Sequence, residues 1–156
     1  MKIVFLHVST AHEEWADRAS DLYLKKISAF MPAADEAMKP RKASREDAAA
    51  KKTRESEQIL EFLKKDDYLI LFDERGEKLD SRGFAKKLET ALGSSKKRLV
   101  FLIGGAYGVD ENVRRRADRV VSLSPLVMNH LLAKTVALEQ IYRAFTILRN
   151  IPYHND

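Results

Sequence analysis

The sequence has no cysteine among its 156 residues, which excludes disulfide bonds and thiolate chemistry. A zinc site would need its four histidines and some carboxylates, but these show no metal-ligand spacing, so no metal is expected. No apolar run approaches the roughly 18 residues of a membrane-spanning helix. The first apolar segment, residues 3–8, contains His7 and lacks the pattern of a signal peptide. These absences predict a cytoplasmic protein with no membrane partner.

Apolar residues make up 45% of the chain and charged residues 33%, which is the balance of a globular protein. The length fits a single domain, residues 1–156. The net charge is +5, and the basic residues cluster at KPRKASR (39–45) and RRR (114–116). Such clusters favour a polyanionic partner such as nucleic acid, although a solvated basic surface explains them equally well.

Short apolar runs typical of strands alternate with amphipathic segments typical of helices. The strands are expected at residues 2–8, 68–72, 98–103 and 119–123, with a weak edge strand at 33–38. Helices are expected at about 13–30, 46–64, 81–92, 110–117 and 130–148, with Ser81 and Asp110 as N-caps. This alternation predicts an α/β fold, a mostly parallel sheet flanked by helices.

Two of the helices have apolar faces that suggest how they pack. Helix 13–30 has one stripe, which we expect in the core: Trp15, Ala19, Leu22, Tyr23, Ile27 and Phe30. Helix 130–148 has two stripes and therefore needs two partners. We expect it to pack on its own sheet and on a second subunit, so the sequence favours a homodimer.

The segment FLIGGAYG (101–108) follows a predicted strand, but it does not match the common phosphate-binding loops. Ile103 replaces the first glycine of a dinucleotide fingerprint, and no ribose-binding carboxylate follows about 20 residues on. No Walker loop or nucleophile elbow is present either. The segment is either a tight turn or a place where a ligand approaches the backbone. The apolar loop SLSPLVMNH (122–130), after the next strand, favours a pocket for a weakly charged ligand, unless it is simply buried.

Together with EQIYRAF and the terminal PYH, these loops resemble the RlmH family of SPOUT-class RNA methyltransferases, and the KIVFLHV start and LFDERG turn agree. The resemblance implies a C-terminal trefoil knot, a homodimer and S-adenosylmethionine as cofactor. It further implies methylation of N3 of a pseudouridine, at position 1915, in the 23S rRNA of assembled ribosomes. The cofactor contacts then fall on Phe72, Gly104, Leu123, Ser124, Pro125, Leu126, Val127 and Met128.

Two positions depart from the family pattern. Asn129 stands where Pro is common, and it can still cap the helix that follows. Lys134 stands where Arg is common, so a phosphate contact there would keep its charge but lose bidentate geometry.

The proton on N3 requires a base, and His130 and His154 are the candidates, although His130 can equally be a capping or packing residue. Lys134 lies in the first turn of its helix, against the dipole, so it favours an anionic partner over a solvent-facing position. The RNA-binding candidates are Lys134, Arg143, Tyr153 and Arg114, with a Glu139–Arg143 helix pair as the simpler interpretation of Arg143.

The tail, residues 149–156, would fray by default, but Pro152, Tyr153 and His154 favour docking over the cofactor or the RNA. The rival function is a non-catalytic RNA- or ribosome-binding α/β module. A receiver domain is less favoured, because HVSTAH has no acidic pair after the first strand.

Overall fold

In the computed structural model, which describes residues 1–8, 11–41 and 47–156, five strands form one parallel sheet of order β2-β1-β4-β3-β5. The strands are β1 (Lys2–Val8), β2 (Ala33–Met38), β3 (Asp67–Lys78), β4 (Arg98–Ile103) and β5 (Arg119–Ser122). The helices are α1 (Glu14–Ser28), α2 (Ala48–Phe62), α3 (Ser81–Leu92), α4 (Glu111–Arg116) and α5 (His130–Leu148). The predicted α/β class, with a parallel sheet flanked by helices, is confirmed.

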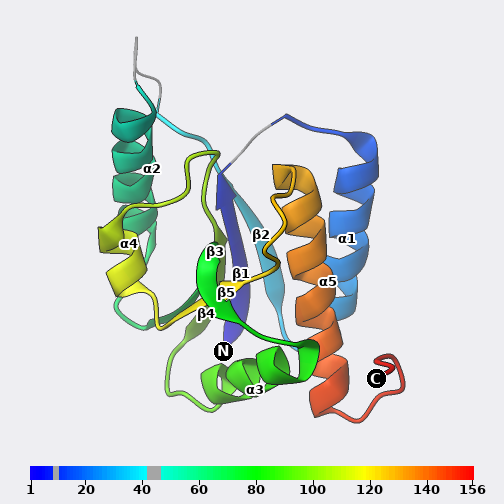
Figure 1. Ribbon diagram of the computed structural model, residues 1–156. Helices are drawn as coiled ribbons and strands as arrows, with labels where there is room; N and C mark the ends of the chain where they lie inside the picture. The colour runs from blue at the N-terminus through cyan, green and yellow to red at the C-terminus, as the bar shows by residue number, and fades with distance from the viewer. Residues whose placement is uncertain (9–10, 42–46) are drawn as a thin grey trace.

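Helices cover both faces of the sheet, with α2 and α4 on one side and α1 and α5 on the other (Figure 1). Alternate residues of each strand point to opposite faces. In β1, Phe5 packs in the cluster with α1, α3 and α5, whereas Leu6 packs in the cluster with α2 and α4. In β4, Phe101 and Leu102 divide in the same way. Because both faces are buried at the centre of the sheet, β1 and β4 are nearly continuous apolar runs.

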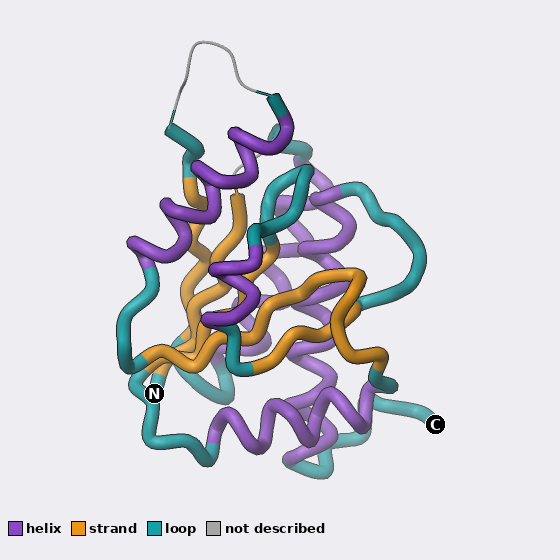
Figure 2. The backbone as a smooth tube through the Cα atoms, turned by 60° about the vertical axis from the view of Figure 1, so that its left-hand side comes forward, coloured by secondary structure: helices purple, strands orange, loops and turns teal. Residues whose placement is uncertain are grey.

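β3 is longer than the apolar pattern at residues 68–72 predicts, because it continues to Lys78. Its polar second half pairs with β5, and both Phe72 and Glu77 align with Val121 across a register shift. Gly76 permits this close approach, since a Cβ there would lie 2.7 Å from the backbone nitrogen of Val121. In Figure 2 this pair of strands extends beyond the others. Tertiary pairing therefore holds a segment that has no apolar pattern of its own.

The predicted core stripe of α1 is partly wrong. Trp15 is 48% exposed and Leu22 is 51% exposed. The buried side of the helix runs through Ala16, Ser20 and Ile27 instead. Tyr23, Ile27 and Phe30 of the predicted stripe do pack on the core. The small residues Ala16 and Ser20 are buried where Trp15 and Leu22 were expected to be.

Short polar side chains cap four helices, α2 to α5, whereas Glu13 before α1 makes no capping hydrogen bond. Asp47 caps α2, and Asp110 caps α4 by accepting hydrogen bonds from Asn112 and Val113. At α3 the cap is Asp80, whose Oδ1 accepts from the N–H of Gly83 at 2.7 Å, so the prediction of Ser81 is wrong by one residue. Asp and Ser are comparable N-caps, so the sequence alone did not separate them.

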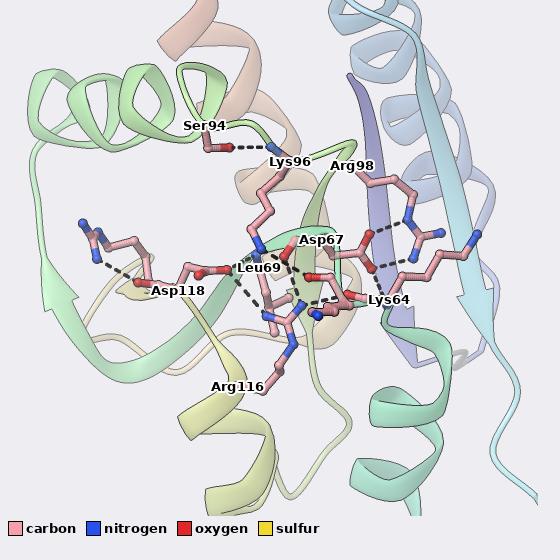
Figure 3. A network of polar contacts seen from close by, with 10 residues as sticks. Lys64, Asp67, Leu69, Ser94, Lys96, Arg98, Arg116 and Asp118 are labelled. Atoms are coloured by element: carbon pink, nitrogen blue, oxygen red, sulfur yellow. Dashed lines mark hydrogen bonds and ion pairs between the residues drawn. The ribbon is translucent and has the colours of Figure 1, made fainter.

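The amino ends of β3 and β4 hold a buried ion pair (Figure 3). The Asp67 side chain is 1% exposed and accepts from Nε and Nη2 of Arg98 at 2.7 and 2.6 Å. It also accepts from the N–H of Lys64 at 2.7 Å. Burial alone would raise the pKa of Asp67, but these hydrogen bonds outweigh burial and lower it. This carboxylate is charged and fully engaged.

Arg116 and Asp118 extend the same network from the end of α4 (Figure 3). The Arg116 guanidinium donates to the carbonyl oxygens of Lys64 and Asp67 at 2.9 and 3.0 Å. The Asp118 carboxylate accepts from the N–H of Leu69 at 2.8 Å. The network ties α4 and β5 to the start of β3.

No helix in the described residues is long and apolar enough to cross a membrane. Nor do residues 1–8, 11–41 and 47–156 contain three His, Cys, Asp or Glu side chains grouped to hold a metal ion. The basic cluster 39–45 lies mostly outside the described residues. At its described end, Arg41 pairs with Glu61 at 2.5 Å.

Candidate active site

A cavity of about 790 Å³ opens beside Phe72 of β3 and at the carboxyl ends of β4 and β5. Its walls come from residues 72–75, from residues 103–108 and from the loop after β5, with Lys52, His130 and Ala133 completing them. Open α/β sheets bind ligands at this edge. The two unusual loops of the sequence therefore meet in one place. The predicted cofactor residues in the lining are Phe72, Gly104, Leu123, Ser124, Leu126, Val127 and Met128, while Pro125 lies outside it.

Three glycines shape the wall that follows β4. The N–H of Gly108 donates to the carbonyl of Gly105 at 3.0 Å, and Gly108 has φ +75°, a conformation that favours glycine. A Cβ on Gly104 would lie 2.8 Å from Cγ1 of Val109. The segment is thus a tight turn that also places bare backbone on the cavity wall. The approach of a ligand to this backbone stays a prediction.

Two residues of helix α2, Glu55 and Ser56, pack against this turn and the residues that follow it. The Oγ of Ser56 accepts from the N–H of Asp110 at 2.9 Å. Beside it, the Glu55 side chain lies against Gly105, where a Cβ would overlap its Oε1 atom. Glu55 is 2% exposed, and neither carboxylate oxygen has a hydrogen-bond partner among the described residues. Burial raises the pKa of Glu55, and the nearby cations Lys51 and Arg54 only partly offset it.

The loop after β5 is open and not buried as a core loop would be. Leu126 is 75% exposed and Val127 is 88% exposed, and both line the cavity. Ser124 fixes the loop locally, because its Oγ accepts from the N–H of Leu126 at 2.9 Å. Exposed apolar side chains grouped beside a cavity indicate contact with a ligand or another chain.

The start of α5 brings His130 into the cavity wall. Asn129 caps the helix, with its Oδ1 accepting from the N–H of Leu131 at 2.9 Å, so this departure from the family pattern keeps a cap. His130 Nε2 is buried and has no partner within the described residues. Burial lowers the pKa of His130, and His7 and Lys134 nearby lower it further. The imidazole is therefore neutral and has an unused nitrogen.

Lys134 is only 8% exposed, so the solvent-facing alternative is wrong. Its amino group donates to Oδ2 of Asp35 at 2.7 Å and lies 3.1 Å from Nε2 of His7. Burial would raise the pKa of Asp35, but the hydrogen bonds with His7 and Lys134 lower it. The anionic partner that the helix position of Lys134 suggests is thus Asp35 of β2. A contact between Lys134 and RNA stays a prediction that would require this pair to open.

The tail is docked on α5. The Tyr153 hydroxyl donates to Oε1 of Glu139 at 2.9 Å, and Arg143 reaches the same oxygen at 2.6 Å, which confirms the predicted helix pair. The Arg143 guanidinium lies 4.6 Å from the centre of the Tyr153 ring, and its Nη1 is 3.1 Å from Nδ1 of His154. Burial, followed by the bond to Glu139, raises the pKa of Tyr153. The tail is therefore docked and not frayed, held by stacking and charge on α5. Its closure over the cofactor or the RNA stays a prediction.

His154 and Asp156 line a second cavity of about 410 Å³, which shares Phe72 and Leu123 with the first. Asp156 is held by Arg82 of α3 at 2.5 Å. The two candidate bases therefore lie in adjoining cavities, with His130 in the first and His154 in the second.

Arg114 forms an ion pair with a residue of the cavity wall. Its guanidinium lies 2.5 Å from Oδ2 of Asp73, a residue of the cavity wall, and its side chain is 15% exposed. An RNA contact by Arg114 stays a prediction, but the structure gives this arginine a partner within the chain.

Sequence reasoning missed Lys52, Glu55, Asp73, Arg75 and the supporting His7–Asp35 pair. Glu55 did carry a signal, because it lies four residues before Ile59 and so on the buried face of α2. The partners of Lys134 and Arg114 carried none, because Asp35 and Asp73 are distant in sequence.

The family described as Predicted SPOUT methyltransferase matches residues 1–154. The match spans nearly the whole chain, and the parallel sheet with its cavity agrees with it. The chain belongs to the SPOUT methyltransferase family.

Two relatives refine this assignment. A protein of Bdellovibrio bacteriovorus is 58% identical over 155 residues, covering 99% of each chain. One of Geobacter sulfurreducens is 40% identical, covering 99% of this chain and 100% of the relative. Both are named Ribosomal RNA large subunit methyltransferase H, so the resemblance to the RlmH family is confirmed.

A solved structure, that of a probable methylase family protein from Haemophilus influenzae, aligns with a TM-score of 0.52 at 14% identity. The alignment covers 95% of this chain and 66% of that one, slightly under two thirds of its length. At this identity the likeness bears on the fold alone.

Proposed function

We propose that the protein transfers a methyl group from S-adenosylmethionine to N3 of a pseudouridine in 23S rRNA. It acts on assembled ribosomes in the cytoplasm, as a homodimer. Family membership and the names of the relatives support a methyltransferase of large-subunit rRNA. The observation that carries the proposal is the meeting of Gly104 and the loop after β5 in one cavity.

The residues of this cavity fit S-adenosylmethionine. The glycine turn presents bare backbone to a ligand, and the exposed Leu126 and Val127 offer an apolar surface for a flat base. Glu55 adds an unpaired carboxylate behind the turn, which suits a cation. A cofactor without phosphates matches a glycine turn that lacks the dinucleotide and Walker patterns.

When bound, the cofactor supplies an electrophilic methyl group on a cationic sulfur. The protein then has to hold N3 of the base in line with that methyl, and such positioning alone accounts for a large part of a rate enhancement. The N3 proton must also leave. His130 is suited to accept it, because its imidazole is neutral and its Nε2 has no partner among the described residues.

The tail and its contacts are the proposed RNA-binding part. Arg143, Tyr153 and His154 form one packed group, in which an aromatic ring and a cation are available to a base and a phosphate. The net charge of +5 favours the same partner. His154 is the alternative proton acceptor, reaching the reaction from the second cavity.

Mass spectrometry of 23S rRNA from a strain lacking this protein tests the proposal. Loss of one methyl group from a pseudouridine, restored by the wild-type gene and not by a variant carrying His130→Ala and His154→Ala, is the expected result. Unchanged rRNA would contradict the proposed reaction. Calorimetry with S-adenosylmethionine separates the rival, because a non-catalytic RNA-binding module would bind ribosomes without binding the cofactor.

A further inference from the structure

Glu55 is a buried carboxylate for which the fold supplies no partner. It is 2% exposed, and neither of its oxygens has a hydrogen-bond partner among the described residues. An unpaired buried carboxylate is among the most unfavourable groups in a protein interior. Glu55 therefore lowers the stability of the folded chain, and its presence calls for a role outside folding.

The backbone of Gly105 lies between this carboxylate and the cavity. Gly105 lines the cavity, and a Cβ on it would overlap Oε1 of Glu55. A side chain at residue 105 would therefore displace the carboxylate. The pairing of a glycine with a buried glutamate places a carboxyl group close to the ligand, and a bound cation there would favour its charged form over the neutral form that burial favours.

Support of the glycine turn does not require this charge. The neighbouring Ser56 already holds the turn, through its bond to the N–H of Asp110. At residue 55 itself no donor of the turn reaches the carboxylate among the described residues, so an apolar side chain of similar size would fill the space. The charge of Glu55, and not its shape, is the feature that lacks a structural explanation.

We propose that Glu55 is a specificity-determining residue whose carboxylate favours the cationic methyl donor over the neutral thioether left after transfer. The inference rests on the proposed use of S-adenosylmethionine. The donor and its product differ by one methyl group and by one positive charge on sulfur, so a fixed charge separates them while contacts to the rest of the molecule do not. Weaker binding of the product assists its release after each turnover.

The other charged residues near the cavity are cations, a carboxylate that is already paired, or a carboxylate that is exposed. Lys52 lines the cavity, and Lys51 and Arg54 lie near Glu55 on the same helix. Asp73 is engaged by Arg114, and Arg75 lies 3.6 Å from Asp73. Glu74 also lines the cavity, but it is exposed, so solvent screens its charge. Glu55 is the buried carboxylate beside the cavity that has no hydrogen-bond partner in the described part of the chain.

Calorimetric titration with S-adenosylmethionine and, separately, with S-adenosylhomocysteine tests the inference. Wild type, Glu55→Gln and the control Glu57→Gln are compared, because Glu57 is an exposed glutamate of the same helix. We expect Glu55→Gln to reduce the preference for the cationic donor by about tenfold, the size expected for one nearby charge in a partly screened site. Glu57→Gln should leave the preference unchanged.

Thermal melting of the same variants separates this role from a structural one. Glu55→Gln should melt at or above the temperature of the wild type, because an unpaired carboxylate is removed. Glu55→Met, which removes the charge without leaving an amide to satisfy, provides a second variant that should show the same loss of preference.

Equal weakening of both ligands, or an unchanged preference in both variants, would overturn the inference and leave the proposed function standing. Wild-type protein that binds neither ligand would overturn the proposed function and this inference with it.

Discussion

The two ends of the sheet differ in whether all of their buried polar groups have hydrogen-bond partners. At the amino ends of β3 and β4, Asp67 accepts two hydrogen bonds from Arg98 and one from the backbone of Lys64. At the carboxyl ends, both oxygens of Glu55 and Nε2 of His130 are buried without a partner among the described residues. The chain is therefore able to satisfy buried charges fully, but it leaves these groups at the carboxyl ends without a partner.

This difference separates residues that stabilise the fold from residues that serve a ligand. A buried ion pair with all its hydrogen bonds fixes how strands and helices meet, whereas an unpaired buried group lowers stability. Even at the carboxyl ends, Asp35 and Lys134 satisfy each other close to His130. The unpaired groups are thus selective exceptions, and they border the proposed cofactor cavity.

Removing the tail residues 153–156 should have the largest effect on activity. Tyr153 and His154 pack on Arg143, and His154 and Asp156 line the second cavity. We expect methylation of ribosomes to fall by at least about a hundredfold, because the RNA would lose its positioning. A methyl-transfer assay with radiolabelled cofactor measures this, and circular dichroism checks that the fold persists. Undiminished activity would show that the tail is not part of the active site.

Asp67→Ala should cause the largest loss of stability, because it leaves Arg98 buried without its partner. We expect the free energy of unfolding to fall by roughly 3–5 kcal/mol in chemical denaturation. Because the pKa of Asp67 is lowered in the folded state, its stabilising effect is complete above the unfolded value of 3.8 and is lost as pH falls through the folded value.

Arg18→Ala is the matched control for this prediction, since Arg18 pairs with Glu14 on the exposed side of α1. It should unfold close to wild type, because exposed pairs contribute little. Similar losses in the two variants would mean that burial of the Asp67–Arg98 pair does not matter.

Gly104→Ala, at the carboxyl ends of the strands, should reduce cofactor binding more than stability. Asp67→Ala, at the amino ends, should mainly reduce stability. The added Cβ would meet Val109 at 2.8 Å and the carbonyl carbon of Gly108 at 3.2 Å, which forces the turn to shift against the cavity. We expect affinity for S-adenosylmethionine to fall by about tenfold in calorimetry, from the loss of close backbone contact. Gly93→Ala, at the end of α3 where a Cβ meets only atoms at 3.5 Å or more, is the control. Equal affinities for the two variants would contradict this role of Gly104.

The pH dependence of methylation should show the smallest effect. The pKa of His130 is lowered from 6.5, so the neutral, proton-accepting form persists below that pH and is lost as pH falls through the lowered value. The acid limb of the rate profile should therefore lie below 6.5 and vanish in His130→Gln. A limb that survives this change would assign the base to another group, with His154 the first to test.

Much of the fold was predictable from local sequence. The bounds of β1, β4 and α5 agree with the apolar runs and the Asn129 cap that mark them. The second half of β3 was not predictable, because its residues are polar and have no apolar pattern. Pairing with β5 holds them in a strand. The buried face of α1 was also misjudged, since small residues such as Ala16 and Ser20 carry a weaker hydrophobic signal than Trp15 and Leu22.

The parts of the site that present backbone to the cavity were predictable from the sequence. Glycine and proline marked the two loops, and both border the cavity. Charged residues were harder, because a charge in the sequence does not reveal whether its partner is solvent, RNA or another side chain. Lys134 and Arg114 have partners in β2 and β3, and Glu55 is buried where a helical glutamate is usually exposed.

Amide chemical shifts of isotope-labelled protein, recorded by NMR as S-adenosylmethionine is added, test the contrast between the two ends most directly. The shifts should concentrate in residues 103–108, in the loop after β5 and at the start of α5. The amides of Leu69 and Arg98 at the amino ends should stay unchanged. Shifts centred on the Asp67–Arg98 network, with the glycine turn unaffected, would contradict the assignment of the carboxyl ends as the cofactor site.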